Sequence, residues 1–138
     1  AAQPAPGAIE AIQAADAVVL CPSNPWVSID PILAVAGYRS ALKRKPVIAV
    51  SPIIQGKTVR GPAARMFSEL GIEPSALAVA EHYQDILSGF VLDDLDAGIE
   101  PQIHAMHITT LATNTVMITL EDRRRLAQVV LNLIKRLK

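Results

Sequence analysis

The 138-residue sequence has a single cysteine, Cys21, and no excess of charge of either sign. One cysteine excludes an internal disulfide and a cysteine-based zinc site. The 13 Lys and Arg residues balance 13 Asp and Glu residues, so the chain has no broad basic face for the phosphates of nucleic acid. Polar or turn residues interrupt every apolar run before it reaches the length of a membrane span. These absences favour a cytoplasmic protein that binds neither nucleic acid nor membrane.

The common motifs of catalytic and metal sites are also incomplete. Gly56-Lys57-Thr58 resembles the end of a P-loop, but the first glycine of that motif would fall on Ser51. The acidic stretch 93–96 lacks the Gly and Glu spacing of a calcium loop, and we predict a solvated connection there. His104 and His107 have no obvious third ligand. Spacing alone therefore identifies neither a catalytic residue nor a metal ligand.

The chain is nevertheless rich in apolar residues. Its hydrophobic fraction is 51% against 19% charged residues, which is enough to offset the ordering entropy of one folded core. Residues 1–7, Ala-Ala-Gln-Pro-Ala-Pro-Gly, have the composition of a linker. This opening has neither an initiator Met nor the charged region of a signal peptide, so we interpret it as a cut inside a longer protein.

Short apolar runs alternate with helix-like segments along residues 8–138. Continuous apolar runs are typical of strands buried on both faces. In the last segment Thr119 and Asp122 form a variant of the capping box ahead of a helical apolar period. The alternation predicts an α/β fold with a layered, mainly parallel, Rossmann-like sheet flanked by helices. The expected strands are 17–20, 47–50, 90–92 and 108–111, and the expected helices are 8–14, 30–43, 62–70, 75–87, 95–106 and 120–138.

The loop after the first predicted strand, residues 21–28, is a candidate binding loop. Ligands of open parallel sheets bind outside the carboxyl ends of the strands. Ser23, Asn24 and Ser28 offer hydroxyl and amide groups there, and the free N–H groups of the helix that follows suit a phosphate. The alternative is a rigid loop whose polar side chains only cap that helix. We expect Trp26, within the same loop, to plug the core.

The loop after the second predicted strand, residues 51–62, is the other candidate. Gly56 allows close approach of backbone to a ligand, and Lys57 supplies a mobile positive charge. Gly61 opens the helix that follows. The alternative is a solvated loop with ordinary surface cations. We expect a third basic stretch, residues 123–125, to be a solvated helix face.

The two loops together resemble the family of 2-phospho-L-lactate transferases. The first match is Asp-Ala-Val-Val-Leu-Cys-Pro-Ser-Asn-Pro at 16–25, followed by Val-Ser-Ile at 27–29 and Pro-Ile-Leu at 31–33. The second is Val-Ser-Pro-Ile-Ile at 50–54, Gly-Lys at 56–57, Gly-Pro-Ala at 61–63 and Met66. The third is Thr-Asn-Thr-Val-Met at 113–117. Order and approximate spacing agree from about residue 4 to the C-terminus.

The resemblance implies a step in the biosynthesis of coenzyme F420. Members of the family transfer a phospholactyl group, or phosphoenolpyruvyl in many bacteria, from a guanosine-diphosphate-linked donor. The acceptor is the terminal hydroxyl of the deazaflavin FO, GMP leaves, and Mg²⁺ assists. Residues 8–138 would then be the C-terminal part of an α/β nucleotide-binding transferase domain, about half of the whole.

The resemblance assigns part of the donor site to this chain. Because the N-terminal half of the family carries the metal-binding aspartates and much of the FO pocket, we expect the Mg²⁺ ligands outside this sequence, and we assign no catalytic residue. We expect the missing N-terminal half to be a partner of this chain, and homodimers are possible. By resemblance and loop chemistry, the substrate-binding residues are Ser23, Asn24, Ser28, Gly56, Lys57 and Gly61.

Two departures from the family pattern bear on this expectation. Asp30 stands where the family usually has Gly, and Gln55 where a Gly is common. A carboxylate near an anion site repels phosphate unless it faces away or helps to hold Mg²⁺. A non-catalytic nucleotide or nucleotide-sugar sensor on a related α/β fold is the alternative function, and an interaction module with an apolar subunit interface is a third.

Overall fold

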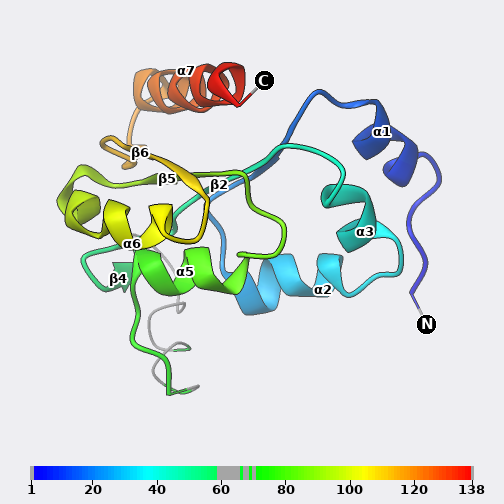
Figure 1. The fold of residues 1–138 in the computed structure, drawn as a ribbon, viewed down its shortest axis with the longest axis horizontal. Coiled ribbons are helices and arrows are strands. Elements are labelled where there is room, and N and C mark those ends of the chain that lie inside the picture. Colours follow the sequence, from blue (N-terminus) through cyan, green and yellow to red (C-terminus); the bar gives the residue numbers. More distant parts are fainter. Residues whose placement is uncertain (1, 59–65, 67–68, 70, 138) are drawn as a thin grey trace.

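The computed structural model describes residues 2–58, 66, 69 and 71–137. Its centre is a four-stranded sheet in the order β1-β2-β5-β6, and every neighbouring pair is parallel (Figure 1). The strands are β1 (Val18–Leu20), β2 (Val47–Val50), β5 (Gly89–Leu92) and β6 (Thr109–Ala112). Each predicted strand is confirmed to within one residue at either end, and β2 and β5 are buried along their whole length. The Rossmann-like α/β fold is confirmed as well.

Helices cover both faces of this sheet, and most match the prediction only in part. They are α1 (Ala8–Ala14), the π-helical turn η1 (Pro25–Ile29), α2 (Asp30–Leu33), α3 (Tyr38–Leu42), α5 (Ala76–His82), the 3₁₀ segment η2 (Asp94–Ile99), α6 (Glu100–His104) and α7 (Leu120–Arg136). The helix expected at 62–70 falls mainly outside the described residues. Within the described residues, none of these helices has the length and apolarity that crossing a membrane requires.

The helix predicted over 30–43 is in fact two short helices. Gly37 separates them with φ of 95°, a left-handed conformation that cannot continue an α-helix and that glycine adopts without strain. A Cβ at this position would lie 3.4 Å from Cδ1 of Ile9. Gly37 therefore stands at the start of α3, after α2 has ended at Leu33, and leaves room for α1 against α3.

A small hairpin replaces the irregular loop expected after β2. Strands β3 (Ile53–Ile54) and β4 (Lys57–Thr58) pair antiparallel. Gln55 and Gly56 between them have φ of 47° and 73°, and positive φ at both central residues is the geometry of a tight two-residue hairpin turn. The Gln-Gly pair is a weak turn signal, and Ile53, which is fully buried, stabilises the hairpin through tertiary packing.

The two faces of the sheet carry separate hydrophobic clusters. The larger cluster, here called the main core, joins Val47, Ala49, Phe90 and Leu92 of the sheet to α3, α5 and α6. On the opposite face, here called the α7 face, Ile48, Val50 and Val91 meet Leu126, Val130 and Leu133 of α7. In Figure 1 α7 lies alone on its side of the sheet. The α7 face is therefore covered by a single helix.

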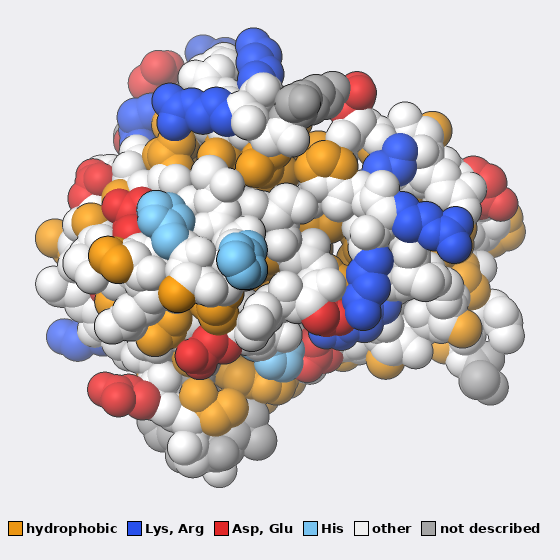
Figure 2. Space-filling view, viewed as in Figure 1, with side chains coloured by type: hydrophobic (Ala, Val, Ile, Leu, Met, Phe, Trp, Pro, Cys, Tyr) orange, Lys and Arg blue, Asp and Glu red, His pale blue; other side chains and the backbone are white. Residues whose placement is uncertain are grey.

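Helix α7 begins at the capping box that the sequence predicted. Thr119 Oγ1 accepts from Asp122 N at 3.2 Å, and Asp122 Oδ2 accepts from Thr119 N at 2.8 Å. This reciprocal pair satisfies two backbone donors that the helix itself cannot. The outward side of α7 carries cations above a band of hydrophobic side chains (Figure 2), which is the amphipathic arrangement that its apolar period indicates.

Candidate functional site

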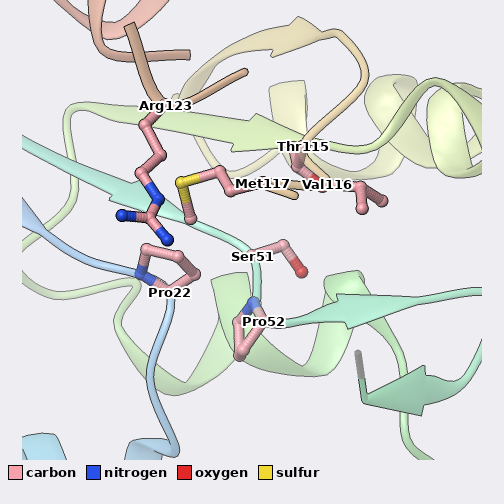
Figure 3. A pocket seen from close by; sticks show the side chains of 7 residues that line it. All are labelled: Pro22, Ser51, Pro52, Thr115, Val116, Met117 and Arg123. Carbon is pink, nitrogen blue, oxygen red and sulfur yellow. The ribbon is translucent and has the colours of Figure 1, made fainter. Parts of the chain in front are cut away.

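The carboxyl ends of the strands meet at a polar pocket. Loops that leave β1, β2 and β6 converge there with the start of α7, and the pocket encloses about 270 Å³ (Figure 3). This is the edge at which open parallel sheets bind ligands. Its lining residues are Pro22, Ser51, Pro52, Thr115, Val116, Met117 and Arg123.

Ser51 fixes the turn that follows β2. Its side chain is 3% exposed, its Oγ donates to the carbonyl of Ile53 at 2.9 Å, and the same Oγ accepts from Ile53 N at 3.1 Å. Ser51 N donates to the carbonyl of Val91 at 2.8 Å. Both hydrogen-bonding capacities of the hydroxyl are thus used within the turn, so Ser51 shapes the pocket floor.

Asp93 holds the segment on the opposite wall. This carboxylate is 4% exposed, and its Oδ2 accepts from Thr115 N at 2.9 Å and Thr115 Oγ1 at 3.0 Å. Its Oδ1 accepts from Leu95 N at 3.1 Å. Three donors compensate the desolvation of the buried charge. Asp93 therefore anchors the 113–117 segment to the end of β5.

The prediction of a solvated connection at residues 93–96 is wrong for Asp93. The carboxylate is withdrawn from water because it receives donors from a segment that lies 22 residues further along the chain. One sequence signal was available, since Asp93 directly follows a buried strand at the edge where ligand sites form. Asp94 and Leu95 beside it are exposed, as the prediction requires.

Arg125 supports the same wall from α7. Its Nη1 donates to the carbonyl of Asn114 at 2.6 Å, and its Nη2 lies 3.9 Å from Asp122 Oδ1. The solvated face predicted for residues 123–125 is therefore wrong at this position, because the side chain turns back over the helix start. Arg124 is exposed and lies 4.0 Å from Glu121, as expected of a surface cation.

Arg123 is the one cation among the residues that line the pocket. Figure 3 shows its guanidinium directed toward Pro22, beside Met117 and across from Ser51. A guanidinium is permanently charged and presents a planar fork that suits phosphate or carboxylate. From the sequence we predict a solvated position for Arg123, because no local pattern distinguishes it from Arg124.

The first predicted loop contributes Pro22 to the pocket, while its polar residues lie elsewhere. Asn24 Oδ1 accepts from Trp26 N at 3.0 Å and Val27 N at 3.3 Å, which caps η1. Asn24 Nδ2 donates to Met66 Sδ at 3.2 Å. The capping interpretation thus applies to Asn24. Ser23 and Ser28 are half-buried, and neither lines the pocket.

The second predicted loop projects its residues from the hairpin. Lys57 is exposed on β4, and a Cβ on Gly56 would lie 3.2 Å from the carbonyl of Pro74. Gln55 N donates to Asp96 Oδ2 at 3.0 Å, which ties the hairpin to η2. Lys57 and Gly56 are not among the pocket residues, and Gly61 lies outside the described residues.

Asp30 faces away from the pocket. Its Oδ1 and Oδ2 lie 2.9 and 3.1 Å from His82 Nε2 on α5. The unexpected carboxylate is therefore engaged by a histidine across the helical layer. Trp26 packs against the main core, with its ring centroid 5.4 Å from that of His82, so the expectation of a core plug is confirmed.

The described residues do not fit the magnesium site that the resemblance implies. No group of three or more His, Cys, Asp or Glu side chains among them is placed to hold a metal ion. Asp93, the buried carboxylate nearest the pocket wall, already accepts three hydrogen bonds. No metal ligand is therefore assigned within this part of the chain.

Within the helical layer, the groups with shifted pKa values lie in α3 and in the segment after α5. The Arg39 guanidinium, and then Lys43, hold the pKa of Asp85 at about 2. Arg39 Nε and Nη2 donate to the two oxygens of this carboxylate at 2.9 and 2.6 Å. Burial raises the pKa of Tyr83 on the same layer. Arg39, Lys43 and Asp85 form ion pairs within the helical layer. They do not line the pocket, where Arg123 supplies the positive charge.

A parallel α/β sheet with a pocket at its carboxyl edge belongs to the class of open α/β folds whose ligand sites form at that edge. Comparison with known families makes this specific, because the model of 2-phospho-L-lactate transferase CofD matches residues 1–133. The chain belongs to this family, as the sequence resemblance predicted.

Three relatives illustrate the similarity. The 2-phospho-L-lactate transferase of Methanosarcina acetivorans is 42% identical over 91% of this chain and 41% of its own length. That of Methanocaldococcus jannaschii is 40% identical over 94% of the chain and 41% of its length. The phosphoenolpyruvate transferase of Streptomyces griseus is 41% identical over 96% of the chain and 42% of its length. The chain thus spans about two fifths of these relatives.

Proposed function

We propose that this chain forms part of the donor site of a transferase of coenzyme F420 biosynthesis. The enzyme moves a phospholactyl or phosphoenolpyruvyl group from a guanosine-diphosphate-linked donor to the terminal hydroxyl of the deazaflavin FO, and GMP leaves. Relatives of both names match the chain with similar identity, so both the phospholactyl and the phosphoenolpyruvyl group remain in the proposal. The observation that carries it is the pocket with Arg123 at the carboxyl edge of a sheet in this family.

The proposed chemistry is a displacement at phosphorus. In such reactions a protein contributes mainly by positioning the reactants and neutralising charge. Arg123 is suited to neutralising charge, because its guanidinium can donate two hydrogen bonds to phosphate oxygens. Asp93 and Arg125 are suited to positioning the reactants, since they fix the 113–117 wall of the pocket.

The residues that the sequence singled out have different parts in this proposal. Because the side chain of Asn24 caps η1, Ser23 and Ser28 are the two residues of the first loop whose hydroxyls we assign to the donor. Lys57 and Gly56 on the hairpin, with Gly61, would approach the donor from the neighbouring strand. Mg²⁺ would supply charge neutralisation at the phosphates, and we place its ligands outside the described residues.

The test compares two arginines on α7 in a full-length protein that contains this chain. We expect Arg123→Ala to weaken the binding of GDP about tenfold or more, the effect of losing a charge-assisted hydrogen-bond partner. Arg124→Ala is the matched control, because Arg124 is 70% exposed and does not line the pocket. Titration calorimetry measures both affinities.

The outcomes separate the proposed activity from its alternative. Equal GDP affinity in the two variants would remove Arg123 from the donor site. Binding of GDP without turnover of FO and the guanylated donor by the full-length protein would instead favour the nucleotide-binding regulator. Turnover that falls with Arg123→Ala supports the transferase.

A further inference from the structure

His82, the last residue of α5, contacts the segment that follows the first candidate loop. Its side chain is 25% exposed, and its Nε2 lies 2.9 and 3.1 Å from the two carboxylate oxygens of Asp30. Asp30 begins α2 directly after η1. In Figure 1 the end of α5 lies beside α2, so this contact ties α5 to the loop that leaves β1.

Aromatic neighbours fix the orientation of the His82 imidazole. Its ring centroid lies 5.4 Å from that of Trp26 and 5.0 Å from that of Tyr83. Trp26 packs against the main core, and Tyr83 is buried within it. Because the core holds both neighbours in place, the imidazole remains directed at Asp30.

Two cations of the same helical layer are engaged by another carboxylate. Arg39 donates to both oxygens of Asp85 at 2.9 and 2.6 Å. Lys43 Nζ lies 3.0 Å from the same carboxylate. These cations are therefore committed to Asp85, and His82 is the group that holds the carboxylate of Asp30.

The direction of the Asp30 side chain matters for the proposed donor site. Ser28, which we assign to the donor, stands two residues before Asp30, so their Cα atoms are at most about 7 Å apart. The screening length at physiological ionic strength is about 8 Å. A carboxylate that turned from α5 toward Ser28 would therefore repel a phosphate bound there.

We propose that His82 is a positioning residue that directs the Asp30 carboxylate away from the donor phosphates. The imidazole holds both carboxylate oxygens toward α5, and an acidic residue directly after η1 is then compatible with an anionic ligand at Ser28. This role rests on the proposed donor site, whereas the contact between the two side chains does not.

The test measures GDP affinity by titration calorimetry in a full-length protein that contains this chain. We expect His82→Ala to weaken GDP binding about threefold or more, because the released carboxylate faces several phosphate charges at short range. Asp30→Asn removes the charge at almost unchanged size and should bind GDP at least as tightly as the parent. In the Asp30→Asn background, His82→Ala should no longer weaken the binding.

Two further variants separate positioning from damage to the helical layer. His82→Gln keeps an N–H donor for Asp30 and should retain the affinity of the parent. Gln84→Ala, at an exposed position just after α5, is the matched control and should leave GDP binding unchanged. No loss from His82→Ala, or equal losses in the parent and in the Asp30→Asn background, would overturn the proposal.

A measurement without GDP tests the pairing separately. Urea unfolding of the parent, the Asp30→Asn and His82→Ala variants and the double variant gives the coupling between the two positions. The midpoint shift of the double variant should be smaller than the sum of the single shifts, because either substitution removes the same charge-assisted hydrogen bond. Additive shifts would overturn the proposal. If coupling is found but the parent does not bind GDP, the donor site and the positioning role both fail while the pairing stands.

Discussion

Asp93 fixes the 113–117 segment that forms one wall of the pocket. It receives hydrogen bonds from Leu95 and Thr115 while 4% exposed. These donors replace the hydrogen bonds to water that the carboxylate loses on burial. It contacts no open volume itself, so we regard it as a positioning residue for the 113–117 wall.

Replacement of Asp93 by Asn should loosen that wall. An amide in place of Oδ2 would face the two Thr115 donors with donors of its own, and we expect a loss of about 2 kcal/mol in the free energy of unfolding. Urea unfolding measures this loss. Asp94→Asn is the matched control, because Asp94 is exposed, and equal losses in the two variants would refute the role of Asp93.

Asp85 predicts a dependence of stability on pH. Arg39 and Lys43 hold its pKa at about 2, below the ordinary 3.8, so the folded state binds this proton less tightly than the unfolded state. The stabilisation is complete above the unfolded pKa and is lost as pH falls from 3.8 through about 2. Because the side chain is 40% exposed, its contribution is below about 1 kcal/mol.

Asp85→Asn should therefore destabilise the protein slightly at pH 7. The difference from the parent should shrink as the pH falls from 4 toward 2, because protonated Asp85 resembles Asn. Urea midpoints measured across this range provide the test. Glu81→Gln, an exposed carboxylate on α5, is the control, and a difference that stays constant with pH would contradict the assignment.

At the scale of elements, the packing of α7 on the sheet depends on Gly89 of β5, which has no side chain. A Cβ on Gly89 would lie 3.1 Å from Leu137 Cδ1 and 3.2 Å from Leu133 Cδ2. The side chains of Leu133 and Leu137 thus occupy the space that a side chain at position 89 would need. This packing matters for function, because α7 also carries Arg123 and Arg125.

Gly89→Ala should separate α7 from the sheet. Overpacking of a tight contact costs about 1–3 kcal/mol, and thermal or urea unfolding would show a loss of this size. Gly98→Ala should have little effect, because no atom lies within 4 Å of a Cβ placed there. A gain of stability in Gly89→Ala would show that α7 moves aside without cost.

The elements also show where sequence patterns are sufficient. The central strands β2 and β5 come from short apolar runs, and α7 has both a clear period and a capping box, so local signals agree with tertiary burial. The β3–β4 hairpin was missed because its two-residue strands are too short for a period. The division of the predicted 30–43 helix into α2 and α3 was missed, since a lone glycine within a helical pattern is a weak signal of a break.

At the scale of the whole molecule, the chain forms one sheet with two unequally covered faces. Four strands and the α3, α5 and α6 layer provide a main core, so the chain has its own folding unit. The α7 face has one helix and an apolar groove of about 490 Å³. The main core is therefore covered by several helices, whereas the α7 face is covered by one.

We expect the 138-residue chain alone to show no transfer of phospholactyl or phosphoenolpyruvyl groups to FO. No group of three metal-ligating side chains lies among its described residues, and the chain spans only about two fifths of the relatives that it matches. Product formation from FO and the guanylated donor is the assay, with the complete Methanosarcina acetivorans enzyme as positive control. Appreciable turnover by the chain alone would contradict the expectation.

The sequence by itself determined the parallel α/β architecture, the start of α7 and the family. These depend on apolar runs, caps and motifs that are local in the chain. Only the tertiary structure decided the composition of the pocket. The pairing of Asp30 with His82, 52 residues away, the burial of Asp93 against Thr115, and the separation of Arg123 from Arg124 all depend on which distant segments meet. Short-range patterns do not encode these contacts, because they form between segments that are far apart in the sequence.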